Sequence, residues 1–292
     1  MDDIVYLNGE LTPISLARIS PLDYSFLYGY GLFETMRAYS GTIFLLERHL
    51  DRLYKASRTL GMVHRLNSYD LGRACYDVLK INKLADARIR LTVSAGEGDM
   101  VPNLDTCKGI TIFIAAQKLA PFSSAKYQEG FNAIISSLRR NSQSPLSRLK
   151  TACYLENILA KRGARAAGFN EALILNERDM LAEGSSSNIF LVDKKVLSTP
   201  SLECGVLPGI TRGVVLEMAQ SLDIKLVETE IKPEELLDSD EAFFTNSIVG
   251  IMPLTYIGDR PVGTGKPGVL TKKLMKAYKK LVVDYQFRKK PD

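Results

Sequence analysis

The stretch NSQSPLSRLKTACYLENILAKRGARAAG, residues 141–168, joins an irregular segment to a helix pattern. Four apolar side chains recur at helical spacing in it, namely Tyr154, Leu155, Ile158 and Leu159. Gly168 follows as the expected helix stop. Lys150 stands just before the helix, and Pro145 and several serines keep the preceding segment irregular. A lysine in such a place can project into a pocket, although a solvated surface position is the simplest interpretation for any one of 38 Lys and Arg residues.

A second stretch, LAEGSSSNIFLVDKKVLSTPSLECGVLPGITR, spans residues 181–212 and ends at another helix pattern. Glu183 opens a run of small residues before a short apolar strand, and LPGITR at 207–212 stands directly before the helix. The start of a helix presents unpaired backbone N–H groups and the positive end of the helix dipole, which suits a phosphate. Taken singly, Glu183 is most simply a loop acid and Thr211 a helix cap. Their ordered combination with Lys150 is more informative than any one residue.

Two runs in this second stretch are distinctive: Glu-x-Ser-x-x-Asn-Ile-Phe at 183–190 and Leu-Pro-Gly-Ile-Thr-Arg at 207–212. Together they resemble the signature of the class IV aminotransferase family, the fold type IV pyridoxal-phosphate enzymes. That family includes branched-chain aminotransferases, D-amino acid transaminases and 4-amino-4-deoxychorismate lyases. The resemblance implies an α+β fold with a small N-terminal α/β sandwich and a larger C-terminal β-barrel-like domain with helices. It also implies pyridoxal 5'-phosphate as the cofactor and a homodimer.

The composition is that of an ordinary globular protein, with 46% hydrophobic and 24% charged residues. At 292 residues the chain is long enough for two modest domains. Its net charge of +5 is spread along the sequence, which disfavours a nucleic-acid surface. The start shows no leader pattern and no apolar run approaches the length of a membrane span, so we expect a cytoplasmic protein without membrane contact.

Cysteine and histidine usage disfavours metal and thiol chemistry. The four cysteines are Cys75, Cys107, Cys153 and Cys204. They are far apart and form no C-x-x-C pair, which argues against a zinc site and a disulfide framework. Only His49 and His64 are present, so a histidine-built metal site or a Ser-His-Asp triad has little to work with. Proton transfer is therefore expected from another group, and a lysine is available.

Hydrophobic periodicity places the expected elements. The first part is expected to contain a hairpin at 4–11 around Asn8-Gly9, helices at 45–62 and 68–84, and strands at 87–97 and 109–118. The second part is expected to contain strands at 131–138, 172–176, 189–193, 196–199, 224–231 and 241–247, and helices after Lys150 and at 211–222, 233–237 and 272–283. The pattern is lost between them. This predicts a small N-terminal α+β domain at 1–118, an inter-domain linker at 119–128, and a larger cofactor-binding domain at 129–292.

The resemblance also implies roles for individual residues around the cofactor. Lys150 would form the imine with pyridoxal phosphate and serve as the base, and Glu183 would face the pyridine nitrogen. Arg52, in the His-x-x-Arg-Leu run at 49–53, would reach the phosphate, for which a planar guanidinium is well suited. The further cofactor contacts implied are Tyr154, the N–H of Ile210, Thr211 and Ser247. Without the resemblance, Arg52 would be expected to pair with Asp51 or Glu47 on a solvated helix face.

Two reactions are open for such a site. The run Phe33-Glu34-Thr35-x-Arg37 and the run Thr245-Asn246-Ser247 resemble the form found in aminodeoxychorismate lyases, and branched-chain enzymes usually have Gly where Thr35 stands. These runs favour a lyase that releases pyruvate and 4-aminobenzoate. The alternative is an aminotransferase of branched-chain L-amino acids or D-amino acids, which would use the same cofactor and lysine. A catalytically silent member kept for interactions would have lost Lys150 or Glu183, and both are present.

Substrate contacts are expected on one strand. Arg88 and Arg90 lie on the same face of the expected strand at 87–97, where the resemblance implies recognition of a carboxylate. Two arginines on a strand face are otherwise most simply exposed to solvent. The Tyr-Ile-Arg-Pro pattern of branched-chain enzymes is absent there, which favours the lyase. Thr35 is a further catalytic candidate and Tyr28 a further substrate-binding candidate.

Overall fold

The computed structural model describes residues 2–289. The chain forms two compact units that do not follow the sequence order strictly. The first unit contains residues 2–120, the segment Leu149–Cys153 and the end of the chain from Tyr285, and the second contains Pro121–Arg148 and Tyr154–Asp284. Lys150 therefore packs as part of the first unit although the sequence on both sides of it belongs to the second.

The first unit is built on a six-stranded antiparallel sheet with the strand order β2-β1-β6-β5-β3-β4. Its strands are β1 (Ile4–Leu7), β2 (Glu10–Pro13), β3 (Gly31–Tyr39), β4 (Thr42–Ile43), β5 (Ala87–Ser94) and β6 (Thr111–Lys118). The expected hairpin is present, with β1 paired to β2. Asn8 and Gly9 both have positive φ, as the tight turn between the two strands requires.

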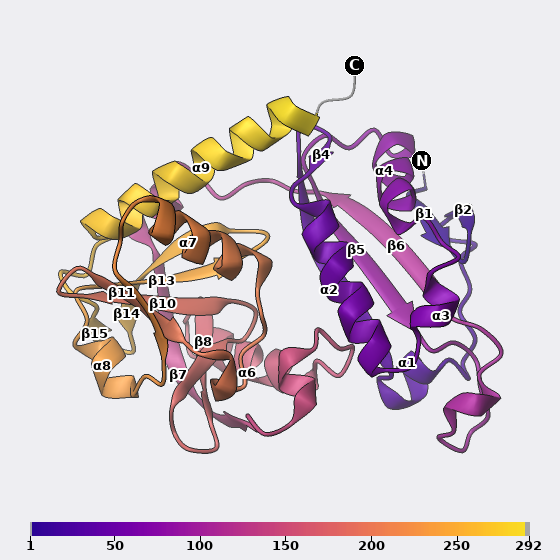
Figure 1. Cartoon of the computed structure of the whole chain (residues 1–292), viewed down its shortest axis with the longest axis horizontal. Helices are drawn as coiled ribbons and strands as arrows, with labels where there is room; N and C mark the ends of the chain where they lie inside the picture. The colour runs from indigo at the N-terminus through magenta and orange to yellow at the C-terminus, as the bar shows by residue number, and fades with distance from the viewer. Residues whose placement is uncertain (1, 290–292) are drawn as a thin grey trace. The chain divides into compact units, whose positions relative to one another are not determined.

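Helices cover one face of this sheet, and α2 and α4 run along it (Figure 1). The helices of this unit are α1 (Tyr24–Tyr28), α2 (Leu46–Thr59), α3 (Val63–Leu66) and α4 (Leu71–Ile81), with a 3-10 turn at Leu104–Thr106. Alternation along the strands sends Leu32, Met36 and Ile89 to the helix side, where they are buried in the core. The opposite face of β3 and β5 carries Thr35 and Arg90, together with the candidate substrate residue Arg88.

The second unit is built on a nine-stranded mixed sheet with the order β12-β11-β10-β13-β14-β7-β8-β9 and with β15 paired to β14. The strands are β7 (Phe131–Arg140), β8 (Glu171–Asn176), β9 (Leu181–Gly184), β10 (Asn188–Asp193), β11 (Val196–Pro200), β12 (Leu226–Thr229), β13 (Glu241–Asn246), β14 (Gly250–Ile257) and β15 (Arg260–Pro261). The helices are α5 (Ser124–Glu129), α6 (Leu155–Ala166), α7 (Ile210–Ser221), α8 (Pro233–Leu237) and α9 (Val269–Lys289), with 3-10 turns at Pro145–Arg148 and Leu202–Cys204. Helix α5 overlaps the segment 119–128 that was expected as a linker and extends one residue beyond it.

The helix expected after Lys150 is present as α6, but its buried face is made of small residues. Ala160 and Ala164 pack against Ala172 and Ile174 of β8. Small side chains allow a helix to approach a sheet closely, so they, and not the larger apolar residues, face the strands. The larger apolar side chains that indicated the helix, Leu155, Ile158 and Leu159, are exposed.

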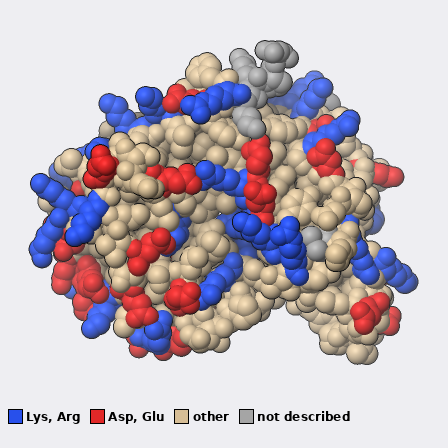
Figure 2. All heavy atoms as spheres, in the orientation of Figure 1, with Lys and Arg blue, Asp and Glu red and all other residues tan. Residues whose placement is uncertain are grey.

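Charged groups of both signs are interspersed over the face of the molecule shown in Figure 2. Among residues 2–289, no helix combines the length and the apolar character needed to span a bilayer. The same residues contain no group of three or more His, Cys, Asp and Glu side chains placed to hold a metal ion.

Two glycines in the first unit predict different responses to the same substitution. Gly61 and Gly96 both have positive φ, but a Cβ at Gly61 would meet nothing within 4 Å, whereas one at Gly96 would lie 2.1 Å from the Gly109 carbonyl oxygen. We expect Gly61→Ala to lower the free energy of unfolding by about 1 kcal/mol through backbone strain alone. Gly96→Ala should cost roughly 3 kcal/mol or more because steric overlap is added. Equal urea midpoints for the two variants would contradict this.

Candidate active site

Lys150 is held at the edge of β3 by backbone pairing. The Phe33 N–H donates to the Lys150 carbonyl over 2.9 Å, and the Ala152 N–H donates to the Gly31 carbonyl over 2.8 Å. Leu32 and Thr151 form an antiparallel bridge between these two bonds. Residues directly opposite each other in an antiparallel pair point to the same face, so Lys150 and Phe33 share a face of the sheet.

Lys150 and a candidate substrate residue, Arg90, both contact the ring of Phe33. The Lys150 Nζ lies 4.5 Å from the centroid of the Phe33 ring, and the Arg90 Cζ lies 3.4 Å from the same centroid. Both cations therefore contact the ring's π system and lie within about 8 Å of each other. Thr35 is the cross-strand partner of Arg90 and shares the face of Phe33. The structure thus brings Lys150, Thr35 and Arg90 together on one face.

Two other expected substrate residues are placed differently. Arg88 is exposed and stands opposite Arg37, whose guanidinium lies 4.3 Å from the centroid of the Tyr39 ring. Tyr28 ends α1 and its hydroxyl donates to the Met100 carbonyl. Arg88 therefore lies two residue pairs further along the strands than Arg90. The Tyr28 hydroxyl already has an acceptor.

Arg52, on α2, lies on the helix side of β3, where its guanidinium forms a side-on pair with the Glu34 carboxylate. Its Nε donates to Glu34 Oε1 over 2.8 Å and its Nη2 to Glu34 Oε2 over 2.6 Å. The Nδ1 of His49 lies 2.7 Å from Glu34 Oε2. Glu34 is only 1% exposed. Burial alone would raise the pKa of the Glu34 carboxyl, but the Arg52 charge and the His49 hydrogen bond outweigh it and lower that pKa from 4.5 to about 2.

In the second unit, Glu183 is held by three donors. Arg140 Nη1 lies 3.3 Å from Glu183 Oε1, and the Asn188 amide and the Leu207 N–H donate to Oε2 over 3.2 and 3.1 Å. The same Asn188 amide donates to the Leu207 carbonyl over 2.9 Å. Asn188 thereby joins Glu183 on β9 to the turn that precedes α7.

The beginning of α7 fits a phosphate. Gly209 is the N-cap, and because it has no side chain it makes no side-chain capping bond to the N–H groups of the first turn. A Cβ at Gly209 would lie 2.0 Å from Asn188 Oδ1, so only glycine allows this close approach. Thr211 is buried in the first turn beside Ile210. Helix N-termini of this kind bind anions through backbone N–H groups and the helix dipole.

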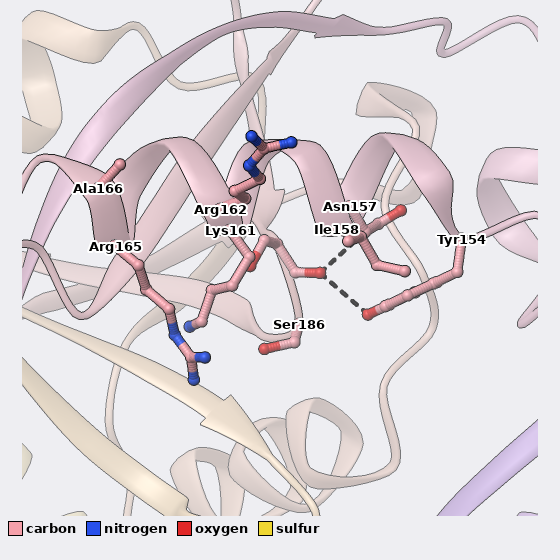
Figure 3. Close-up of a pocket in the computed structure, with 9 residues that line it drawn as sticks. Tyr154, Asn157, Ile158, Lys161, Arg162, Arg165, Ala166 and Ser186 are labelled. Atoms are coloured by element: carbon pink, nitrogen blue, oxygen red, sulfur yellow. Dashed lines mark hydrogen bonds between the residues drawn. The ribbon is translucent and has the colours of Figure 1, made fainter.

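Tyr154 and the serine run at 185–187 meet at a pocket in the second unit. The Tyr154 hydroxyl and the Asn157 amide both donate over 2.9 Å to the Ser185 carbonyl, as the dashed lines in Figure 3 show. The pocket measures about 530 Å³ and is lined by α6 and by Ser185 and Ser186. Glu171 lies beneath the run and accepts hydrogen bonds from its serine hydroxyls. The Tyr154 hydroxyl is therefore used to hold the loop that follows Glu183.

Ser247 lies in the turn between β13 and β14, which Asn246 ties to the serine run. Asn246 Oδ1 accepts from the N–H groups of Ile248 and Val249, each over 2.9 Å, and its Nδ2 donates to the Ser186 carbonyl over 3.1 Å. These partners fix the amide orientation, because two are donors and one is an acceptor. The two loops that carry Ser186 and Ser247 are thus tied together.

Sequence reasoning missed three residues of these clusters. Glu34 was considered only as part of a motif. Its place between Leu32 and Met36, on the buried side of β3, indicates a charge that must be paired. Arg140 carries no signal in the sequence that would distinguish it from a solvated charge at a strand end, yet it is buried beside Glu183. Asn188 was recognised as part of the signature without a role.

The first unit contains a lysine over an aromatic ring, and the second contains a buried glutamate and a helix N-terminus that begins at glycine. Enzymes that bind a phosphorylated pyridine cofactor use groups of these kinds. Residues 31–257 match the family model described as amino-transferase class IV. The chain therefore belongs to the class IV aminotransferase family.

Relatives within the family carry different names. The chain is 36% identical over 279 residues to the aminodeoxychorismate lyase of Bacillus subtilis, covering 95% of this chain and 94% of that protein. It is 33% identical over 287 residues to the branched-chain-amino-acid aminotransferase of Pseudomonas aeruginosa, covering 96% and 93%. Further relatives carry a branched-chain name, and one, from Methanocaldococcus jannaschii, is also 36% identical over 276 residues, covering 94% of this chain and 95% of that protein.

Two solved structures support the fold. The branched-chain amino acid aminotransferase of Escherichia coli superimposes with a TM-score of 0.89 at 27% identity, covering 96% of this chain and 95% of that one. A branched-chain amino acid aminotransferase from T.th. with pyridoxamine 5'-phosphate also gives a TM-score of 0.89, at 28% identity, covering 97% of this chain and 94% of that one. The expectations of a fold type IV architecture and of a family that uses pyridoxal phosphate are confirmed.

Replacement of Asn188 tests its joining role. We expect Asn188→Ala to lower the free energy of unfolding by roughly 2 kcal/mol, because Glu183 and the Leu207 carbonyl each lose a buried donor. Asn188→Asp should cost more, since it sets a carboxylate against Glu183. Both values are measurable by urea unfolding, and an Asn188→Asp protein as stable as the wild type would contradict the assignment.

The cluster of Glu34, Arg52 and His49 predicts that the free energy of unfolding depends on pH. A folded-state pKa below the unfolded value means that the ionised pair stabilises the fold above about pH 4.5 and that this stability is lost as the pH falls towards 2. The shift corresponds to roughly 3 kcal/mol. The difference in unfolding free energy between wild type and Glu34→Gln should therefore shrink over that range, whereas exposed Glu10→Gln should show little difference at any pH. A difference that is constant with pH would count against an ionised Glu34.

Proposed function

We propose that this class IV family enzyme is a 4-amino-4-deoxychorismate lyase. The reaction removes the proton from the amino-bearing ring carbon and breaks the bond between the neighbouring ring carbon and the enolpyruvyl oxygen. The ring becomes aromatic 4-aminobenzoate, and the released enolpyruvate takes up a proton to give pyruvate. Nothing is oxidised by an external acceptor, so a keto acid is not needed.

Pyridoxal phosphate supplies an electron sink that makes the proton on the amino-bearing carbon removable. Lys150 is the proposed covalent partner of the cofactor and the base that takes this proton through Nζ. Glu183, oriented by Asn188 and Arg140, is proposed to face the pyridine nitrogen. The phosphate would be held by Arg52, the N–H of Ile210, Thr211 and Ser247. Tyr154, whose hydroxyl donates to the Ser185 carbonyl, is proposed as a partner of the cofactor's ring hydroxyl.

The polar pair of Thr35 and Arg90 beside Lys150 is the observation that carries the lyase proposal. Aminodeoxychorismate has two carboxylates, and a guanidinium within about 8 Å of the Lys150 amine suits one of them. Arg37 and Arg88 continue the row of cations along the same face. Apart from the Phe33 ring, a branched aliphatic side chain would meet the charged and hydroxyl groups of Arg90 and Thr35 on this face of the first unit.

A second candidate is an aminotransferase of branched-chain L-amino acids or D-amino acids. It is supported by relatives named as branched-chain aminotransferases along nearly the full chain. It would use Lys150 and Glu183 in the same roles, with a keto acid as the second substrate.

Purified holoenzyme separates the two candidates. Incubated with 4-amino-4-deoxychorismate and no keto acid, it should release pyruvate, and Lys150→Ala should abolish both this activity and the cofactor absorption band above roughly 400 nm. Conversion of L-leucine or D-alanine with no pyruvate from aminodeoxychorismate would establish the aminotransferase instead.

Substitution of the arginine row tests the substrate assignment. We expect Arg90→Met to raise KM for aminodeoxychorismate by about tenfold or more, because one charge-assisted pair is lost near the reacting carbon. Arg88→Met should have a smaller effect, since Arg88 is exposed and lies two residue pairs further along the strands. Equal effects of the two substitutions would show that this face acts only through its overall charge.

The homodimer, the cytoplasmic location and the expected domain boundaries stay predictions. Exposed apolar side chains on α6, namely Leu155, Ile158 and Leu159, are consistent with a covered surface in an oligomer. Sedimentation of the purified protein would give its oligomeric state.

A further inference from the structure

Glu34 is an acid on the core side of its strand. Its neighbours on that side of β3, Leu32 and Met36, belong to the hydrophobic core, and Glu34 is as inaccessible as they are. Burying a carboxylate is costly unless it is paired and hydrogen-bonded. Glu34 meets both conditions through two residues of α2, Arg52 and His49.

The pairing of Arg52 with Glu34 uses one defined edge of the guanidinium. Nε and Nη2 each donate to a different carboxylate oxygen, which is the side-on bidentate arrangement. A guanidinium carries five N–H donors in a rigid plane, and those of Nη1 point along its other edge. Glu34 therefore fixes the plane and the direction of the guanidinium at the end of a long side chain.

His49 in turn fixes Glu34. It precedes Arg52 by three residues, so both side chains lie on the same face of α2. Burial lowers the pKa of His49, more than the Glu34 carboxylate beside it raises it, which favours a neutral ring whose Nδ1–H donates to Glu34 Oε2. The charge of Lys150 also lowers that pKa, so the cluster and the lysine interact electrostatically.

We propose that Glu34 and His49 are positioning residues for the cofactor phosphate, which aim the outer edge of Arg52 at it. This rests on the phosphate role given to Arg52 under the proposed function. With a neutral His49, Glu34 offsets the charge of Arg52, so the cluster as a whole carries little net charge. Arg52 then recognises the phosphate through direction and hydrogen bonding more than through net attraction.

This arrangement gives Glu34→Gln two opposite effects on cofactor binding. Removing the carboxylate leaves an extra positive charge, which by itself would strengthen phosphate binding. It also releases the Arg52 plane, which would weaken binding that depends on geometry. The sign of the measured change therefore distinguishes positioning from simple charge.

The experiment compares two probes that differ only in the phosphate. Cofactor-free full-length protein is titrated with pyridoxal 5'-phosphate and with pyridoxal, and the ratio of their affinities reports the phosphate contacts. We expect Glu34→Gln to lower this ratio by about tenfold while the affinity for pyridoxal stays close to that of the wild type. An unchanged or increased ratio would overturn the proposal.

Asp23→Asn is the matched control. Asp23 is also a buried carboxylate of the first unit, and it accepts hydrogen bonds from the Ser25 N–H and the hydroxyls of Ser94 and Thr111. Asp23→Asn should lower the free energy of unfolding without changing the ratio of the two cofactor affinities. If both substitutions lowered the ratio equally, the effect of Glu34→Gln would be a general loosening of the unit and the proposal would fail.

Substitutions of His49 give a test that does not depend on Glu34→Gln folding. His49→Leu removes the donor to Glu34, whereas His49→Asn can place an amide N–H near the position of Nδ1. We expect the affinity ratio to fall in His49→Leu and to be largely restored in His49→Asn. Equal ratios for the two variants would contradict the positioning role.

The outcomes separate this proposal from the proposed function. A wild-type protein that binds both probes equally would overturn the phosphate role of Arg52 and this proposal with it. A wild type that prefers the phosphorylated probe, together with a Glu34→Gln protein that keeps the preference, would overturn the positioning role alone. Pyruvate release from aminodeoxychorismate is measured independently of both.

Discussion

The short backbone pairing between the Lys150 segment and the start of β3 is the constraint on which the site depends. Two hydrogen bonds and one bridge, from Gly31 to Phe33, take a five-residue piece of chain out of the second unit and fasten it to the first. Backbone bonds determine the face to which a side chain points without relying on that side chain's own contacts. The Lys150 amine is thereby placed over Phe33 before any ligand is considered.

In the second unit, side-chain amides hold the candidate site residues in place. Asn188 joins Glu183 to the turn before α7, and Asn246 joins the serine run to the turn that contains Ser247. An amide carries both donors and acceptors, so one residue can satisfy groups of both kinds on two loops. Loops that would otherwise move independently are held at fixed separations, which a site for a rigid ring and phosphate requires.

Much of the fold was predictable from the sequence because its elements are strongly patterned. The hairpin at Asn8-Gly9, the helix α2 and the strands β5 and β6 all follow from local periodicity and turn chemistry. The strand β14 was not identified, since its residues are buried almost throughout and show no alternation. The exposure of Leu155 and Ile158 on α6 was also unforeseen, because periodicity shows that a helix is amphipathic but not which face meets the sheet.

The candidate site was predictable where a motif marks it, as at Lys150. The contacts of Arg140 with Glu183 and of Glu34 with Arg52 were not predictable, because they join residues on different elements and no single stretch of sequence specifies them.

The return of Leu149–Cys153 to the first unit has a consequence for dissecting the protein. A fragment ending at Ala120 would contain the whole six-stranded sheet but not the segment that covers the start of β3. The N–H of Phe33 and the carbonyl of Gly31 would then lie on an uncovered strand edge, which is the kind of edge that recruits strands from other molecules. In the full chain the lysine segment therefore also protects this strand edge from self-association, so the boundary between the units is a poor place to cut the chain.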